Sequence, residues 1–148
     1  MRLNIALEID KEIYEKYGEN RFDLKTKLFR KMCVENKKQI INHKNLHCHL
    51  PIKKSTFDKI HSDNLPNISP QMALVIAIAL TNSYDEACIY LMACRAYFYK
   101  EKGTKYEMYH DLMEKYCKND KCDGIDRLYE VNNELREKGY SVICEIKE

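Results

Sequence analysis

Glycine, proline and long hydrophobic runs are scarce in this sequence. Its 148 residues include four glycines and three prolines, too few for the many tight turns of an all-β fold. No stretch of 18 consecutive apolar residues occurs, and the longest apolar run, near residues 72–80, has the length of a buried helix. The first ten residues, MRLNIALEID, lack the apolar segment of a signal peptide, so we expect a cytoplasmic protein. The length suits one domain, or one domain with an appendage, that buries a core of its own.

The cysteines do not follow the pattern of a disulfide framework. Their number, seven, is odd, they are scattered along the chain, and several fall within apolar helical patterns. We therefore expect reduced thiols that pack as small hydrophobic side chains.

Positive charge is concentrated in one part of the chain. Residues 25–61 carry ten Lys and Arg against Glu35 and Asp58, a net charge of +8, although the whole chain carries only +2. Residues 1–24 have a net charge of −2 and residues 62–148 a net charge of −4. Such a concentration is typical of a surface that binds a polyanion, because basic side chains that neutralise phosphates release counterions. A solvated basic face without a ligand gives the same pattern, so charge alone leaves both interpretations open.

The hydrophobic pattern predicts a mainly α-helical protein with a short β-strand at each end. Apolar residues alternate with polar or small ones over residues 2–9 and 140–146, which is the period of a strand. We expect the two strands to pair antiparallel on the helical body, with pairing across a dimer as the alternative. Asp10 is expected to cap a short helix that ends at Gly18. Further helices are predicted over 22–36, 40–50, 53–61 and 70–80, after the capping boxes at 83–86 and 104–107, and from Asp123 to Gly139.

Residues 46–60, LHCHLPIKKSTFDKI, fit two short helices joined by a sharp corner. Pro51 disfavours helix at the preceding residue and so forces the corner. Phe57 and Ile60 would bury the back of the second helix, which leaves polar residues on its front. Lysines and hydroxyls there suit contacts to phosphates and base edges. These residues are Lys53, Lys54, Ser55, Thr56 and Lys59.

Because of these residues, the segment resembles the lambda-repressor/Cro-type helix-turn-helix family. IKKSTFDKI is similar to the family's recognition helix, LPNISPQMALVIAIAL to its next core helix and TNSYDEACIYL to its fifth, so the resemblance covers about residues 24–95. Residues 109–136 are similar to an extension that follows this domain in some Firmicutes-type regulators. The resemblance implies a five-helix core with two additional C-terminal helices. It divides the chain into a strand and short helix (1–21), a DNA-binding domain (22–100) and a helical extension that ends in a strand (101–148).

The resemblance implies a transcription regulator of bacterial, phage or mobile-element type, such as a repressor. Two copies would form a homodimer on double-stranded DNA and each would place the 53–61 helix in the major groove. Neither an enzymatic activity nor a cofactor is implied. Lysines near that helix would anchor the protein on phosphates; these are Lys25, Lys37, Lys38, Lys44 and Lys59.

Three residues depart from the family pattern. His47 stands where a small residue is usual in the bracing helix, Pro51 replaces the turn glycine, and Lys53 replaces the Ser or Thr cap. These changes affect mainly the contacts to base edges, on which recognition of a particular DNA sequence depends. They leave a second interpretation open, in which a degenerate helix-turn-helix scaffold serves as a protein–protein interaction module.

Other constellations in the sequence are less specific. His43, His47, Cys48 and His49 are close in sequence, but the additional pair Cys117 and Cys122 has a spacing unlike that of common zinc knuckles, so we expect no metal. The start of the chain is also similar to ribbon-helix-helix DNA binders. Its groove-facing set of Arg2, Asn4, Ala6 and Glu8 suits an anionic ligand poorly.

Overall fold

The structure, a computed structural model, describes residues 3–35, 45–64, 67–81, 83–96, 105–117 and 124–146, most of which are helical. Within these ranges no strand occurs. The elements are α1 (Leu3–Tyr17), α2 (Arg21–Glu35), the 3-10 turn η1 (Leu46–Cys48), α3 (Lys54–His61), α4 (Pro70–Leu80), α5 (Tyr84–Ala93), α6 (Lys105–Cys117) and α7 (Gly124–Glu137). The prediction of a mainly helical protein is therefore confirmed.

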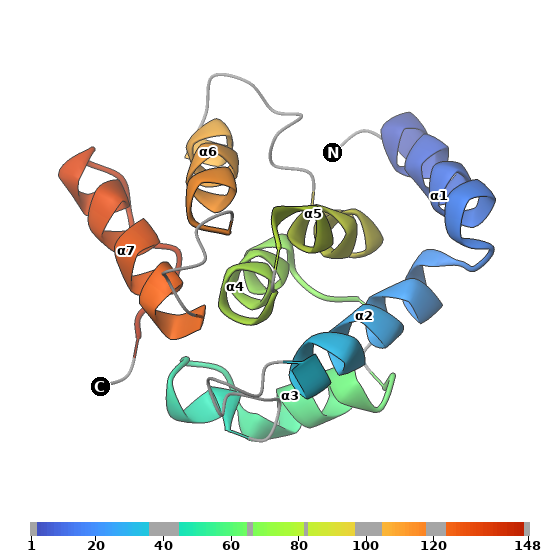
Figure 1. Ribbon diagram of the computed structural model, residues 1–148, viewed down its shortest axis with the longest axis horizontal. Helices are drawn as coiled ribbons and strands as arrows, with labels where there is room; N and C mark the ends of the chain where they lie inside the picture. The colour runs from blue at the N-terminus through green and yellow to red at the C-terminus, as the bar shows by residue number, and fades with distance from the viewer. Residues whose placement is uncertain are drawn as a thin grey trace.

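Helix α4 lies at the centre of the molecule (Figure 1). All eight residues from Ala73 to Leu80 are buried, so this helix is apolar on every side. Helices α5, α6 and α7 pack directly against it. On the other side of α5, α2 contacts both α5 and α3, which places α3 at the edge of the bundle.

Two of the predicted helix starts are confirmed in atomic detail. The Ser69 hydroxyl accepts a hydrogen bond from the Met72 N–H at 3.1 Å, with Pro70 in the first turn of α4. The Ser83 hydroxyl accepts one from the Glu86 N–H, also at 3.1 Å, at the start of α5. Each cap satisfies an N–H group that the helix leaves without an internal partner.

The predicted N-terminal strand is wrong, because residues 3–17 form helix α1. The buried side chains are Ile9 and Ile13, one helical turn apart, whereas Leu7 is 57% exposed. A lone strand would leave its backbone groups unpaired, whereas a helix satisfies them internally. The ribbon of a ribbon-helix-helix protein is excluded with the strand. Asp10 is not a cap but lies in the middle of α1, where its carboxylate pairs with Arg95.

The predicted C-terminal strand is also wrong, since residues 140–146 run without a strand partner in the described part of the chain. The alternating pattern places Tyr140, Val142, Cys144 and Ile146 on one face, but the buried residue is Ile143. This segment instead takes its hydrogen bonds from side chains of α4 and α7. Because no neighbouring strand is present, the groups that the segment binds decide which of its side chains are buried.

One hydrophobic cluster joins α2 to α7, and a second, smaller one attaches α1. The large cluster includes Phe57 of α3, Leu74 of α4 and Val131 of α7, so residues from the expected ranges 22–100 and 101–148 share a core. The small cluster consists of Ile9, Ile13, Leu24 and Ala93. None of the helices in the described part combines the length and apolar character needed to span a membrane.

The six cysteines within the described residues are free thiols. Cys94 and Cys117 are buried, and burial raises the pKa of Cys94 to about 12. A thiol in such surroundings stays protonated at neutral pH and packs as a small hydrophobic side chain.

Candidate nucleic-acid interface

Helix α3 is anchored by its back and exposes its front. Phe57 and Ile60 have no exposed surface and belong to the main core cluster, as the sequence predicted. The predicted contact residues are exposed, except that Thr56 is half-buried; the set is Lys53, Lys54, Ser55, Thr56 and Lys59. In α3, Ser55 and Lys59 therefore lie opposite the buried side, Lys54 and Thr56 lie on its two flanks, and Lys53 precedes the helix at the cap position.

The corner before α3 is built around Pro51 without a glycine. The Ile52 N–H donates to the Leu50 carbonyl at 2.8 Å, which closes a three-residue γ-turn around the proline. The inverse form of this turn has a central φ near −75°, which a proline ring adopts without strain. Leu46 and Leu50 are both fully buried beside the corner.

The element before the corner differs from the predicted helix over residues 40–50. Residues 40–44 lie outside the described part, and residues 46–48 form the 3-10 turn η1. A 3-10 turn is tighter than an α-helix and is used in short connectors. The described part of this element therefore supports α3 through buried leucines and a compact turn.

The first turn of α3 has no side-chain cap. Lys53 occupies the cap position with φ −65° and ψ 144°, and its side chain accepts no hydrogen bond. The contribution of Lys53 to the first turn is its backbone carbonyl, which accepts a hydrogen bond from the Thr56 N–H at 3.0 Å. This end of α3 therefore combines N–H groups without helical partners with two lysine side chains.

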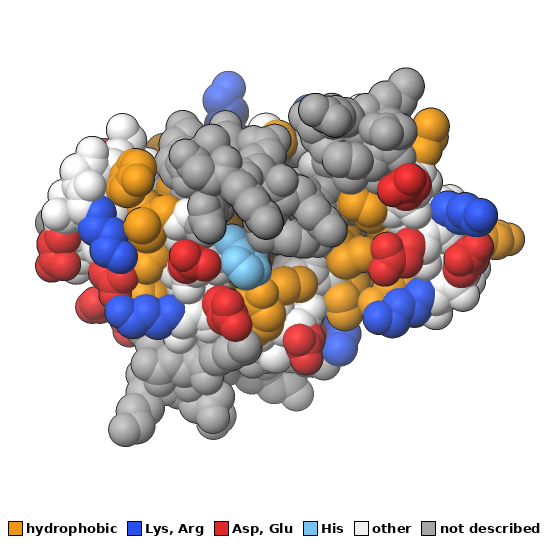
Figure 2. Space-filling view, turned by 90° about the horizontal axis from the view of Figure 1, so that it is seen from above, with side chains coloured by type: hydrophobic (Ala, Val, Ile, Leu, Met, Phe, Trp, Pro, Cys, Tyr) orange, Lys and Arg blue, Asp and Glu red, His pale blue; other side chains and the backbone are white. Residues whose placement is uncertain are grey.

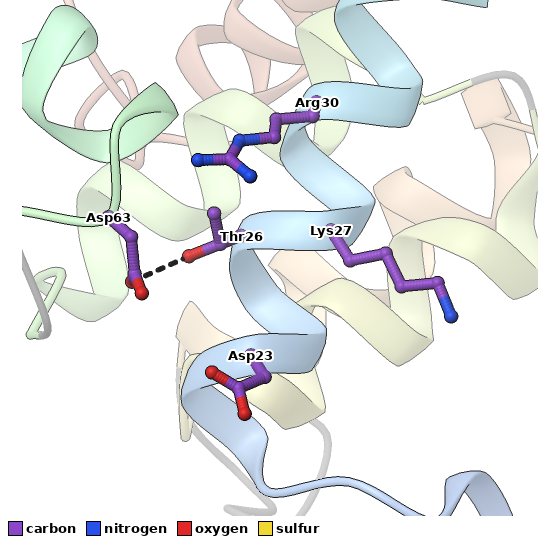
Figure 3. Close-up of a pocket in the computed structure, with 5 residues that line it drawn as sticks. All are labelled: Asp23, Thr26, Lys27, Arg30 and Asp63. Atoms are coloured by element: carbon purple, nitrogen blue, oxygen red, sulfur yellow. Dashed lines mark hydrogen bonds between the residues drawn. The ribbon is translucent and has the colours of Figure 1, made fainter.

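The last turn of α3 is held by α2. Asp63 lies just past the helix with a left-handed φ of 63°, and the Asn64 N–H donates to the Lys59 carbonyl at 2.8 Å, as in a Schellman motif. The Thr26 hydroxyl donates to the Asp63 carboxylate at 2.8 Å (Figure 3), and Arg30 Nε donates to the His61 carbonyl at 2.7 Å. Two side chains of α2 thus fix the position of α3.

A pocket of about 300 Å³ lies between α2 and the turn after α3 (Figure 3). In the figure, Arg30 reaches towards the side of Asp63, whereas Lys27 points the other way. Two carboxylates balance the two cations, so the pocket has no preference for anions. Its lining residues are Asp23, Thr26, Lys27, Arg30 and Asp63. We attribute this pocket to the space that remains where α3 docks on α2.

Lys25 does not belong to the exposed basic surface, contrary to its predicted role as a phosphate contact. Its side chain is 0% exposed, and burial lowers its pKa. The ammonium group lies 6.0 Å from the centre of the Phe22 ring. A signal for this was present in the sequence, because Lys25 precedes the buried Phe29 by one helical turn, on the apolar face of α2.

The remaining lysines of the basic segment differ in how far they are neutralised. Lys27 lies 3.4 Å from Glu19, Lys31 lies 3.5 Å from Glu86, and Lys54 lies 3.5 Å from Asp58. Lys53 and Lys59 have no acidic side chain of the described residues within 4.0 Å. The predicted phosphate contacts Lys37, Lys38 and Lys44 lie outside the described residues.

The face of the molecule that is turned away from α3 carries a different mixture of charges. Figure 2 views the molecule from the side of α5 and α6, and acidic side chains are spread across this face among basic and hydrophobic ones. The described part of this face thus mixes both signs of charge, unlike the exposed lysines at α3.

The histidines near η1 do not gather a ligand set within the described part of the chain. No group of three His, Cys, Asp or Glu side chains placed to hold a metal ion occurs there. His43 and Cys122, which the sequence pattern also singled out, lie outside the described residues.

Comparison with known proteins adds no further constraint. No family model matches the sequence, and no curated protein or solved structure is significantly similar to it.

Proposed function

We propose that this protein is a DNA-binding transcription regulator that places α3 in the major groove of double-stranded DNA. The observation that carries the proposal is the construction of α3, whose back is fixed by Phe57 and Ile60 and whose exposed residues are lysines and a serine: Lys54, Ser55 and Lys59, with Lys53 just before the helix. A short helix with this division of residues fits the width of the major groove. A homodimer would present two such helices to successive half-sites.

The position of α3 on the bundle supports this proposal. Helix α3 lies at the edge of the bundle and is braced from one side by α2. Thr26 and Arg30 hold its last turn, so the helix is presented as a rigid element. Rigid presentation favours sequence-specific contacts, because little conformational entropy is lost on binding.

A protein–protein interaction module is the second candidate. The pairing of Lys54 with Asp58 favours it, because this pair neutralises part of the front of α3. The uncapped first turn at Lys53 and the proline corner also differ from the helix-turn-helix pattern. In this alternative, the same face of α3 would dock an acidic protein surface.

The two candidates are separated by binding to labelled duplex DNA of random sequence, measured by fluorescence anisotropy. The association constant should fall as salt rises from about 50 to 200 mM, with a log–log slope of about 0.9 for each phosphate contacted. The double variant Lys53→Glu, Lys54→Glu should weaken binding by at least about tenfold, because two cations at the interface become anions.

The matched control is Lys11→Glu with Lys16→Glu, which changes the net charge equally on exposed positions of α1. This control should retain most of the binding. Equal losses in both double variants would refute docking through α3 and leave only a general charge effect. Absence of binding even at low salt would favour the interaction module.

A further inference from the structure

The segment after α7 is bound to the helices in the way that a peptide ligand is bound. Asn132 of α7 is buried, and its side-chain amide makes two hydrogen bonds to the segment's backbone. Its Oδ1 accepts from the Ile143 N–H at 3.0 Å, and its Nδ2 donates to the Cys144 carbonyl at 2.9 Å. Gln71 of α4 donates to the Ile143 carbonyl through its side-chain amide. These amides replace the neighbouring strand that the segment lacks.

An apolar anchor accompanies these backbone contacts. Ile143 is 4% exposed and is part of the main core cluster, while Cys144 and Ile146 are partly buried against it. A pocket of about 150 Å³ continues along the segment, lined by Tyr129, Asn132, Arg136, Glu145 and Ile146. Backbone capture with one buried side chain is a common way of binding an extended peptide, and it depends little on how the peptide is connected.

The connection between this segment and α7 is a single sharp turn. Gly139 has a left-handed φ of +81°, and the Tyr140 N–H donates to the Leu135 carbonyl at 2.8 Å. Opening this one turn would carry residues 140–146 away from their own α7 without disturbing any helix. Two aromatic side chains, Tyr129 beside the segment and Tyr140 at the turn, are each 40% exposed.

We propose that the groove between α4 and α7 is a binding site for an extended peptide segment and that its intermolecular occupant is residues 140–146 of a second copy of this chain. In a reciprocal exchange, each copy's Asn132 and Gln71 hold the partner's segment, so these contacts are kept, whereas the Tyr140–Leu135 bond of the turn is lost. The two turns then run side by side, which covers the exposed Tyr140 of each copy. This exchange is independent of DNA binding, although it would supply a dimer.

The test is to open the turn with Gly139→Val. A β-branched residue strongly disfavours φ +81°, whereas no atom lies within 4 Å of an added Cβ, so the substitution strains the turn without a clash. Light scattering after size-exclusion chromatography, over roughly a hundredfold range of concentration, should show at least about a fivefold higher dimerisation constant than the native chain.

Gly18→Val is the matched control, because Gly18 ends α1 with a φ of +70° and also has no atom within 4 Å of an added Cβ. This variant should dimerise no more than the native chain.

A synthetic peptide of residues 140–146, YSVICEI, tests the groove in the intact full-length chain. In excess it should dissociate the Gly139→Val dimer, whereas the same peptide with Ile143→Asp should not. The proposal is overturned if Gly139→Val stays monomeric, if it dimerises only as much as Gly18→Val, or if the peptide leaves its dimer intact.

Discussion

Among the described residues other than glycine, two adopt the left-handed backbone conformation, and each uses its side chain to join two helices. Asp63, with φ 63°, follows α3 and accepts a hydrogen bond from Thr26 of α2. Arg95, with φ 57°, follows α5 and pairs with Asp10 of α1. A left-handed residue with a Cβ is strained by about 1 kcal/mol relative to glycine. The interhelical contacts offset that strain at both positions.

A substitution series at Asp63 separates the backbone strain from the side-chain contact. Asp63→Ala keeps the strain and loses the hydrogen bond, so the free energy of unfolding should fall by about 1–2 kcal/mol. Asp63→Gly loses the same bond but relieves the strain, and it should be about 1 kcal/mol more stable than the alanine variant. Urea denaturation measures both. Equal stability of the two variants would show that the left-handed turn is not strained.

At the scale of elements, α3 depends on contacts made by other helices. Its eight residues are too few to form a stable helix alone, and its N-terminal cap position carries a lysine that makes no side-chain cap bond. The helix persists because Phe57 and Ile60 enter the core and because α2 holds its last turn. The ring of Phe29 on α2 also meets the His61 ring edge-on, with 6.4 Å between their centres.

Truncation of the buried anchor should therefore release α3. Phe57→Ala should lower the free energy of unfolding by about 3–5 kcal/mol, because it leaves a cavity in a fully packed site. Ser55→Ala is exposed on the same helix and should change it by less than about 0.5 kcal/mol. Thermal or urea unfolding followed by circular dichroism gives both values. A small effect of Phe57→Ala would mean that α3 is held mainly by its turns.

At the scale of the whole molecule, the two parts that the sequence suggests share one interior. Helix α4 contacts α5 on one side and α6 and α7 on another, and Arg127 of α7 donates to the carbonyl of Thr81, just after α4, at 2.6 Å. Both parts contribute apolar side chains to one buried cluster. The C-terminal helices are therefore integral to the core that presents α3.

We expect one cooperative unfolding transition as a consequence. The helical signal in circular dichroism and the tyrosine fluorescence should change with the same urea midpoint, because Tyr90 and Tyr109 are buried in the shared cluster. The absence of tryptophan makes tyrosine the natural reporter. Two separate midpoints would show that residues 22–100 and 101–148 unfold as independent units.

Local signals in the sequence were sufficient for most helices and for the face of α3. Ser69 with Pro70, and the capping box that begins at Ser83, set helix starts through bonds to groups three residues away. Phe57 and Ile60 are three residues apart, so helical geometry alone puts them on one face. Such contacts lie within one turn of the chain, and a sequence pattern can report them directly.

The tertiary structure decided what depends on partners distant in the chain. The alternating ends predicted strands, but α1 pairs its backbone internally, and residues 140–146 bind Asn132 and Gln71 instead of another strand. Lys25 is a charged residue and was therefore predicted to lie on the surface, but the packing of α2 buries its side chain. The sequence by itself determined most of the helices and the exposed lysines of α3. Only the assembled core determined which segments are buried, because burial depends on the surfaces that meet across the fold.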